Sequence, residues 1–194
     1  MTDSASAQQS LVLYAHQTMA DWEYGYVVGC LGMFAADGFT VPPVVVAGAD
    51  TAPVRSLGGL TVTPQISLAE LDPDEVAMLV LPGGMDWDQP HAEVFALADQ
   101  VLQRGNAVAG ICGAVPAMAR EGLLDEVPHT GNDPAEFEGI DYRGDNRYLA
   151  GVGAVGSGDI ITASGAHALE FTREVFRRLG LPADAIDEWY AAFS

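Results

Sequence analysis

Cys112 is the residue of this chain whose surroundings best suit nucleophilic chemistry. The apolar run Ala107–Ile111 precedes it, and the small residues Gly113 and Ala114 follow it. A strand, a nucleophile and a helix that begins with small residues form a nucleophile elbow, a strained turn that projects the side chain at the carboxyl edge of the sheet. The partial positive charge at the start of that helix favours a thiolate and lowers the thiol pKa. We therefore predict a reactive thiolate at Cys112.

The two cysteines of the chain have different surroundings. The elbow pattern alone leaves open that Cys112 is a buried thiol at the end of a core strand, because free cysteine is among the most buried residue types. Cys30 lies inside an amphipathic pattern with no turn beside it, which indicates core packing. A disulfide framework is not expected from two cysteines, and a reducing compartment suits them better.

A second turn rich in glycine follows another apolar run. Pro82 precedes Gly83 and Gly84 at the end of residues 76–81. Glycines at a strand end let backbone N–H groups approach a ligand, so the N–H groups of Gly84 and Gly113 are candidates for an oxyanion hole. The alternative is a tight strand-to-helix turn without a chemical role.

Composition excludes several kinds of chemistry. All eight basic residues are arginines, so no lysine is present to form a Schiff base. No cysteines or histidines have metal-ligand spacing, and no Gly-x-Gly-x-x-Gly motif follows a strand, so we expect neither a metal nor a cofactor. With 27 acidic residues the net charge is −19, which disfavours nucleic acid and anionic lipid as partners. Coding bias and adaptation to high salt are both compatible with this composition.

The elements that must position these residues alternate between strand and helix patterns, which is typical of a parallel sheet covered on both faces. The predicted strands are residues 11–15, 44–47, 76–81, 107–111 and 159–163, and the predicted helices are residues 23–36, 92–104, 113–121 and 166–179. Residues 51–67 suggest a hairpin or an excursion at the sheet edge, residues 129–148 suggest short strands and loops near the sheet edge, and residues 148–155 are ambiguous.

The length of 194 residues suits one domain, which we place at residues 11–194 after a disordered leader at residues 1–10. The leader has no signal-peptide pattern, and no run approaches the length that spans a bilayer. We expect a cytoplasmic protein.

Three motifs in order resemble the ThiJ/PfpI superfamily, which is related to class I glutamine amidotransferases. They are residues 20–23 (Ala-Asp-Trp-Glu), residues 81–84 (Leu-Pro-Gly-Gly) and residues 109–114 around Cys112. The resemblance implies an α/β flavodoxin-like three-layer sandwich with a mostly parallel central sheet, and a homodimer. It also implies that Glu23 lies beside Cys112, protonated and hydrogen-bonded to the sulfur or to its oxidised forms, which requires burial to raise the carboxyl pKa. Without the resemblance, the residue pattern indicates only an acidic residue near a helix N-terminus, where the helix dipole stabilises a negative charge.

The histidine of the predicted site departs from the family pattern. Many family members carry a histidine directly after the cysteine, where this chain has Gly113. His129 falls where other members place a histidine on the following strand, so we name it as a candidate general base. His16 lies near the expected mouth of the site without a motif, whereas His91 and His167 have the positions of helix-start residues.

The resemblance implies one of two functions. The first is a stress-related, cysteine-dependent hydrolase or glyoxalase in which Cys112 attacks a small carbonyl or amide substrate. The alternative is a non-enzymatic sensor or protective protein in which an oxidant converts Cys112 to a sulfinate stabilised by Glu23. The sequence offers no specific support for a chaperone-like role.

Overall fold

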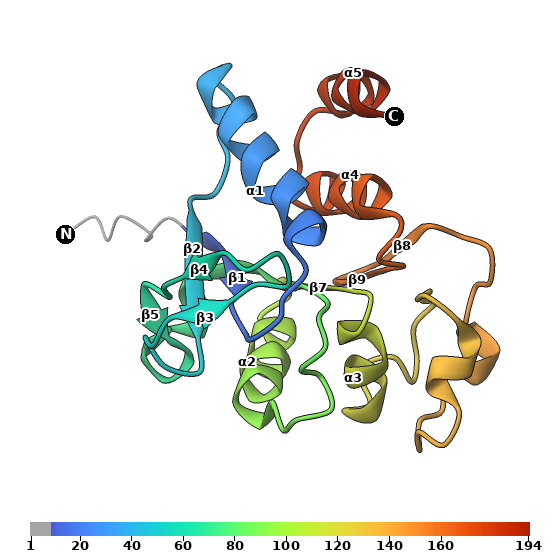
Figure 1. Ribbon diagram of the computed structural model, residues 1–194. Helices are drawn as coiled ribbons and strands as arrows, with labels where there is room; N and C mark the ends of the chain where they lie inside the picture. Colours follow the sequence, from blue (N-terminus) through green and yellow to red (C-terminus); the bar gives the residue numbers. More distant parts are fainter. Residues whose placement is uncertain (1–8) are drawn as a thin grey trace, which may run out of the picture.

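The computed structural model describes residues 9–194, and a seven-stranded sheet with helices on both faces forms its centre (Figure 1). The strand order is β5-β2-β1-β6-β7-β9-β8, and every neighbouring pair is parallel except β9 and β8. The strands of this sheet are β1 (Ser10–Tyr14), β2 (Val44–Gly48), β5 (Ile66–Ser67), β6 (Val76–Leu81), β7 (Ala107–Ile111), β8 (Ala154–Ser157) and β9 (Ile160–Ala163). The predicted mostly parallel α/β sandwich is confirmed.

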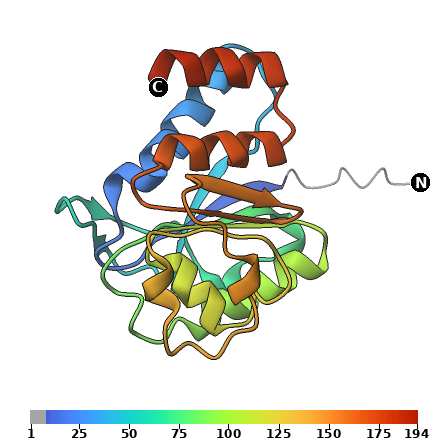
Figure 2. The same cartoon turned by 90° about the vertical axis from the view of Figure 1, so that its right-hand side faces the viewer.

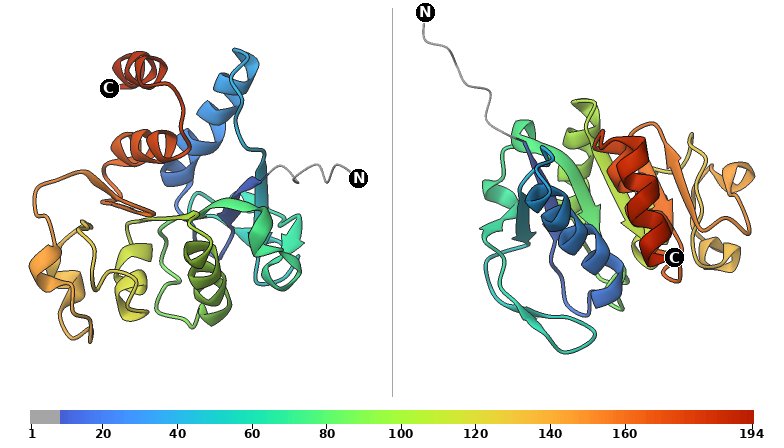
Figure 3. Two further views of the ribbon diagram at one scale, coloured as in Figure 1. Left: turned by 180° about the vertical axis from the view of Figure 1, so that it is seen from behind. Right: turned by 90° about the horizontal axis from the view of Figure 1, so that it is seen from above.

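The helices form two layers around this sheet. The helices are α1 (Asp21–Ala36), α2 (Ala92–Gln103), α3 (Ala114–Arg120), α4 (Ala168–Arg178) and α5 (Ala183–Phe193). Helices α2 and α3 cover one face, while α1 and α4 cover the other (Figures 1 and 2). Helices α1 and α4 lie side by side, as Figure 3 shows from above, and α5 packs on the outer side of α4.

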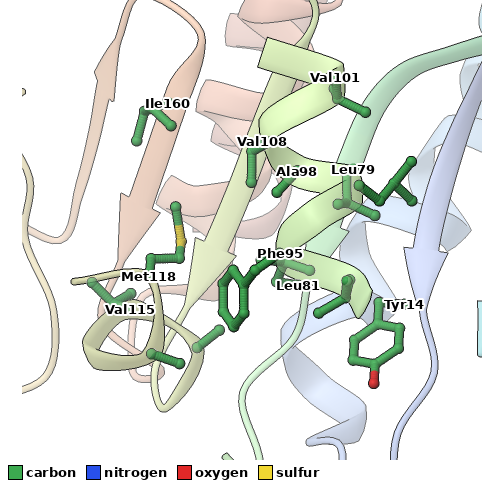
Figure 4. Close-up of a cluster of buried hydrophobic side chains, with 14 of the residues drawn as sticks. Tyr14, Leu79, Leu81, Phe95, Ala98, Val101, Val108, Val115, Met118 and Ile160 are labelled. Carbon is green, nitrogen blue, oxygen red and sulfur yellow. The ribbon is translucent and has the colours of Figure 1, made fainter. Parts of the chain in front are cut away.

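The central strands are apolar along their whole length because helices cover both of their sides. In β6 and β7 nearly every residue is buried, and both strands have the predicted bounds. Figure 4 shows Leu79 and Leu81 of β6 packed with Phe95, Ala98 and Val101 of α2. The second core, on the α1 and α4 side, is built around phenylalanines.

The hairpin predicted within residues 51–67 is confirmed, since β3 (Val54–Arg55) pairs antiparallel with β4 (Thr61–Val62). Beyond it, β5 joins the main sheet beside β2. The ambiguous residues 148–155 include the start of β8, which turns back on β9 as an antiparallel edge strand. Residues 129–148 contain short 3₁₀ turns (Pro134–Phe137 and Asp145–Arg147) and an isolated bridge between His129 and Tyr148. Two further 3₁₀ turns (Leu68–Glu70 and Pro73–Glu75) lie before β6.

Two expectations at the chain ends need correction. Ser10, assigned to the leader, begins β1, and residues 1–8 of that leader lie outside the described residues. Helix α5 was not predicted, although Trp189 and Ile186 bury its inner face. Among the described helices, none combines the length and apolar character needed to cross a membrane.

The topology brings the candidate residues together. Strands β1, β6, β7 and β9 are adjacent and parallel, so their carboxyl ends meet at one edge of the sheet. Open α/β sheets bind ligands at this edge.

Candidate functional site

Cys112 occupies the predicted elbow between β7 and α3. Its φ is 57°, a left-handed conformation that only one other non-glycine residue in the described chain, Thr18, adopts. Its N–H donates to the carbonyl of Ala163 (2.9 Å) and its carbonyl accepts from the N–H of Val115 (2.9 Å). These two bonds hold the side chain out of the sheet in a strained conformation. The thiol is partly buried, so the alternative of a sealed core cysteine does not apply.

Glu23, in the first turn of α1, lies beside the sulfur as the resemblance implied. The residue is fully buried, and its Oε2 accepts a 2.5 Å hydrogen bond from the N–H of Gly83. Its Oε1 faces the Cys112 sulfur and has no other hydrogen-bond partner among the described residues. A buried carboxyl oxygen next to a thiol is placed to share a proton with it.

Two glycines enclose the Cys112–Glu23 pair. A methyl group on Gly83 would lie 2.6 Å from Cβ of Cys112 and 2.6 Å from Oε2 of Glu23. A methyl group on Gly165, which follows β9, would lie 2.8 Å from Oε1 of Glu23 and 3.0 Å from the sulfur. Any side chain at either position would push the two reactive groups apart.

Burial controls the protonation of the pair. It raises the pKa of Glu23 to about 7, against the opposing effects of hydrogen bonds with Cys112 and Gly83. Burial and the charge of Glu23 raise the pKa of the Cys112 thiol to about 11, although hydrogen bonds from Asn132 and the Gly113 N–H lower it. The expected lowering of the thiol pKa is therefore wrong, because burial, the largest cause, raises it. Between these two values the pair holds one proton, which the two groups share.

Asn132 is a site residue that the sequence did not reveal. Its Nδ2 donates to the Cys112 sulfur (3.3 Å) and to Oε1 of Glu136 (3.1 Å), and its Oδ1 accepts from the N–H of Gly165 (2.9 Å). The carbonyl of Gly165 in turn accepts from the indole N–H of Trp22 (2.9 Å). The sequence carries no signal for Asn132 itself. It does place Asn132's partner Gly165 two residues beyond a strand end, at the edge of the sheet where ligands bind.

His129 does not reach the sulfur, which corrects its assignment as a candidate base. Its ring is buried, with Nδ1 hydrogen-bonded to the carbonyl of Val127 (2.9 Å) and Nε2 3.4 Å from the hydroxyl of Tyr142. Burial also lowers the pKa of His129. Among residues 9–194, no hydrogen bond joins a histidine to Cys112.

Of the other three histidines, His16 and His91 bond to nearby backbone carbonyls, whereas Nδ1 of His167 has no partner among the described residues. His16 donates from Nε2 to the carbonyl of Pro82 (3.1 Å) and packs against Gly84. His91 and His167 are the N-cap residues of α2 and α4, in agreement with their predicted helix-start positions. Cys30 is buried in the core, also as predicted.

The two glycines of the predicted oxyanion hole lie together at the mouth of the site. A methyl group on Gly113 would lie 2.9 Å from the carbonyl oxygen of Gly84, so the two backbones pack closely. Both residues line a cleft of about 280 Å³. The Gly113 N–H already points at the sulfur, and in the described chain the N–H of Gly84 donates to no protein atom.

This arrangement agrees with comparisons to known proteins. The family profile of DJ-1/PfpI proteins matches residues 9–178. The chain belongs to the DJ-1/PfpI family. A Bacillus subtilis protein named "Uncharacterized protease YoaZ" is 35% identical over 188 residues, which is 94% of this chain and 89% of the relative.

Solved structures of the family share the fold closely. The DJ-1 superfamily protein Atu0886 from Agrobacterium tumefaciens is 34% identical, with a TM-score of 0.84 over 95% of this chain and 97% of that one. A thiJ/pfpI family protein from Bacillus anthracis is also 34% identical, with a TM-score of 0.85 over 94% of this chain and 88% of that one. Within residues 9–194, no three His, Cys, Asp or Glu side chains are grouped to hold a metal ion.

Proposed function

We propose that this DJ-1/PfpI family protein is a cysteine-dependent enzyme that acts on a small carbonyl or amide substrate through Cys112. The observation that carries the proposal is the placement of a partly buried thiol, on a strained elbow, against a buried carboxyl with an otherwise unpartnered oxygen. The name of the Bacillus subtilis relative adds amide hydrolysis to the reactions worth testing, beside glyoxalase chemistry.

The chemical step uses the proton that Glu23 and Cys112 share. When this proton resides on Glu23, the sulfur is a thiolate, because the acid no longer repels its charge and donates a hydrogen bond to it. The thiolate forms a bond to the carbonyl carbon, and the π electrons of the carbonyl move to its oxygen. The N–H groups of Gly84 and Gly113 stabilise the resulting oxyanion. Glu23 then supplies its proton to that oxygen or to the leaving group.

Asn132 has a positioning role in this scheme. Its Nδ2 holds the sulfur and its Oδ1 holds the backbone at Gly165, so the amide fixes the thiolate relative to Glu23. It contributes a neutral donor at a place where a histidine would contribute a base. A reaction that needs a strong general base, such as peptide-bond hydrolysis, is therefore less well served than addition to an aldehyde.

The test is turnover by the purified protein of methylglyoxal and, separately, of a small chromogenic amide. We expect turnover of at least one of them, abolished in Cys112→Ser and retained in Cys30→Ser, which removes the buried core thiol instead. Absence of turnover with both substrates, or unchanged turnover in Cys112→Ser, would overturn the enzymatic proposal.

The oxidation of Cys112 to a sulfinate is the second candidate, and the donors around the sulfur favour it. A protonated Glu23, Nδ2 of Asn132 and the Gly113 N–H surround the sulfur with three donors. Two equivalents of hydrogen peroxide oxidise the thiolate in turn to sulfenate and sulfinate, and each is reduced to water. The intact mass after mild peroxide treatment tests this function. A gain of two oxygens that Cys112→Ser blocks supports it, and equal oxidation of both cysteines contradicts it.

A further inference from the structure

The cleft at the mouth of the site carries one cation in a chain with few of them. Gly84 and Gly113 line it together with other residues, among them Trp87, Asp88, Arg120 and Glu136. Arg120 is the last residue of α3, the helix that begins directly after the elbow. The cleft therefore joins the two candidate oxyanion amides to a guanidinium group.

Arg120 differs from most arginines of this protein in having no carboxylate partner. Five of the eight arginines form ion pairs with acidic side chains. Arg120 instead donates from Nη2 to the backbone carbonyl of Trp87 (2.7 Å), and among the described residues it forms no ion pair. The bond to Trp87 fixes the guanidinium at the wall of the cleft and leaves its other N–H groups available. A planar donor fork of this kind matches a carboxylate or a phosphate.

The two acidic residues of the cleft limit what Arg120 can accept. Glu136 accepts hydrogen bonds from Nδ2 of Asn132, so its carboxylate has a partner within the protein. Asp88 is exposed and faces the same cleft. With one positive and two negative groups present, the cleft disfavours a ligand that carries several negative charges. It suits a single anionic group placed at the guanidinium.

The length of α3 sets the distance between the reacting carbon and this anionic group. Arg120 follows Gly113 by seven residues, or about 10 Å along a helix that rises 1.5 Å per residue. A helical side chain leans toward the N-terminus of its helix, so the guanidinium extends back toward the elbow. From this separation along the helix we expect the anionic group to lie several bonds from the attacked carbonyl rather than directly on it.

From this arrangement we infer that Arg120 binds the anionic end of the substrate, and that the substrate is a small carbonyl or amide compound with one carboxylate several bonds from the attacked carbon. This inference rests on the proposed function, because it assigns the substrate class of the same site. The carbonyl oxygen accepts hydrogen bonds from the N–H groups of Gly84 and Gly113. The carboxylate accepts hydrogen bonds from the N–H groups of Arg120 that do not bond to Trp87.

Matched alkylating reagents test the inference without knowledge of the natural substrate. Bromoacetyl-β-alanine carries a carboxylate several bonds from its reactive carbon, and its terminal amide is a neutral molecule of the same shape. Each reacts when the Cys112 sulfur displaces bromide from the CH₂ group, so that an S–C bond forms and the C–Br bond breaks. The thiol proton passes to Glu23 or to solvent. Mass spectrometry of the Cys112 peptide gives the alkylation rate with each reagent, and the rate with the acid is divided by the rate with the amide. This ratio is then divided by the same ratio measured for glutathione, which corrects for the intrinsic reactivity of the two reagents.

We expect Arg120→Gln to lower this normalised ratio by about tenfold, the effect of one charge-assisted hydrogen bond, while the amide rate changes little. Arg104→Gln is the matched control, because it removes the same charge at the far end of α2 and should leave the ratio unchanged. Asp88→Asn should raise the ratio. Arg120→Lys keeps the charge without the planar fork and should fall between the wild type and Arg120→Gln.

The outcomes separate this inference from the proposed function. Equal normalised ratios in wild type, Arg120→Gln and Arg120→Lys would overturn the role of Arg120, even if Cys112 reacts rapidly with both reagents. Failure of both reagents to label Cys112 in the wild type would overturn the reactive thiol itself, and the inference with it. Bromoacetyl-glycine, with a shorter arm, should show a smaller acid preference, and an equal or larger one contradicts the proposed spacing.

Discussion

At the scale of single residues, the protonation of Cys112 and Glu23 decides the behaviour of the site. The thiol is expected to be unreactive below pH about 7, because both groups are then protonated. Alkylation by iodoacetamide should rise as pH passes about 7, when one proton leaves the pair. In Glu23→Gln this step should disappear. The remaining rise in labelling follows ionisation of the thiol itself. It should occur about one pH unit lower than in the wild type, because no ionised carboxylate raises the thiol pKa.

Labelling of the Cys112 peptide as a function of pH, in both proteins, checks this prediction. Cys30 in the same digest is the internal control, since burial raises the pKa of its thiol and no substitution is made near it. A curve that moves to higher pH in Glu23→Gln would contradict the prediction. It would mean that Glu23 acts mainly as a hydrogen-bond donor to the thiolate.

The same carboxyl affects stability with a definite sign. The pKa of Glu23 is about 7 in the folded protein, against 4.5 for an unperturbed glutamate, so the folded state binds more protons between these values. Stability therefore falls as pH rises from about 4.5 through about 7. Glu23→Gln removes this cost, since its carbonyl can accept from Gly83 while its amide donates to the sulfur. We expect the variant to be more stable than wild type near pH 8 by on the order of 2 kcal/mol.

Thermal or urea unfolding at pH 5 and pH 8 measures this difference. The two proteins should converge at the lower pH, where wild-type Glu23 is protonated in the folded state. A Glu23→Gln variant that is less stable than wild type at the higher pH would contradict the assigned burial cost.

Gly165 determines the spacing of the reacting pair. Gly165→Ala would place a methyl group 2.8 Å from Oε1 of Glu23 and 3.0 Å from the sulfur. We expect a loss of about 1–3 kcal/mol in unfolding free energy and a changed labelling rate at Cys112, because both neighbours are held by other bonds. Gly29→Ala is the control: no atom lies within 4 Å of that methyl group, and the helix should gain about 0.5–1 kcal/mol. Equal stabilities of the two variants would contradict the crowding at Gly165.

At the scale of elements, the sequence predicted what depends on local pattern. Strands β6 and β7 have the predicted bounds because each is an apolar run that follows polar residues and ends at a turn containing glycine. The elbow was predictable because its small residues and its cysteine are consecutive. Glu23 was identified only through the family resemblance, since its contact with the sulfur joins residues far apart in the chain.

The failures depend on contacts that no local pattern encodes. His129 has the right residue type, but its ring is enclosed by Phe137, Tyr142 and Tyr148, and this aromatic packing decides its direction. Asn132 was missed because an asparagine in a polar loop has no distinguishing sequence signal. Helix α5 was missed because its acidic outer face and short length conceal the few apolar residues that it buries.

Helix α5 also provides a stability test. Trp189 is 6% exposed, and its ring lies 5.0 Å from that of Phe176 between centroids. Trp189→Ala should lower the free energy of unfolding by about 3 kcal/mol, since it leaves a cavity under the helix. Phe193→Ala, on the same helix at 39% exposure, should cost about 1 kcal/mol or less. Urea unfolding of the two variants measures both values, and equal losses would show that α5 is anchored elsewhere.

At the scale of the whole molecule, the net charge of −19 is the dominant property. Self-repulsion of so many carboxylates opposes the compact state, and only five ion pairs with arginine relieve it in the described chain. Added salt screens the repulsion, because the Debye length falls from about 30 Å at 0.01 M to about 3 Å at 1 M. The melting temperature should therefore rise with sodium chloride.

Thermal melts in sodium chloride and potassium chloride at equal ionic strength check this prediction. Screening predicts the same rise for both salts, levelling off once the Debye length is shorter than the spacing between charges. A melting temperature that falls with salt would show that the ion pairs outweigh the repulsion. A rise that continues to molar salt would favour adaptation to high salt over coding bias as the origin of the composition.

The enclosure of Cys112 and Glu23 by Gly83 and Gly165 has a consequence for how such a protein diversifies. The main chain at these two glycines and the side chain of Asn132 enclose the pair, so few substitutions nearby leave its spacing unchanged. The adjoining cleft is lined in part by exposed side chains from three separate segments, which are Asp88, Arg120 and Glu136. Asp88 and Arg120 can be exchanged without disturbing the sulfur, whereas Glu136 is linked to it through Asn132, so under the proposed function the choice of ligand rests mainly on the first two positions.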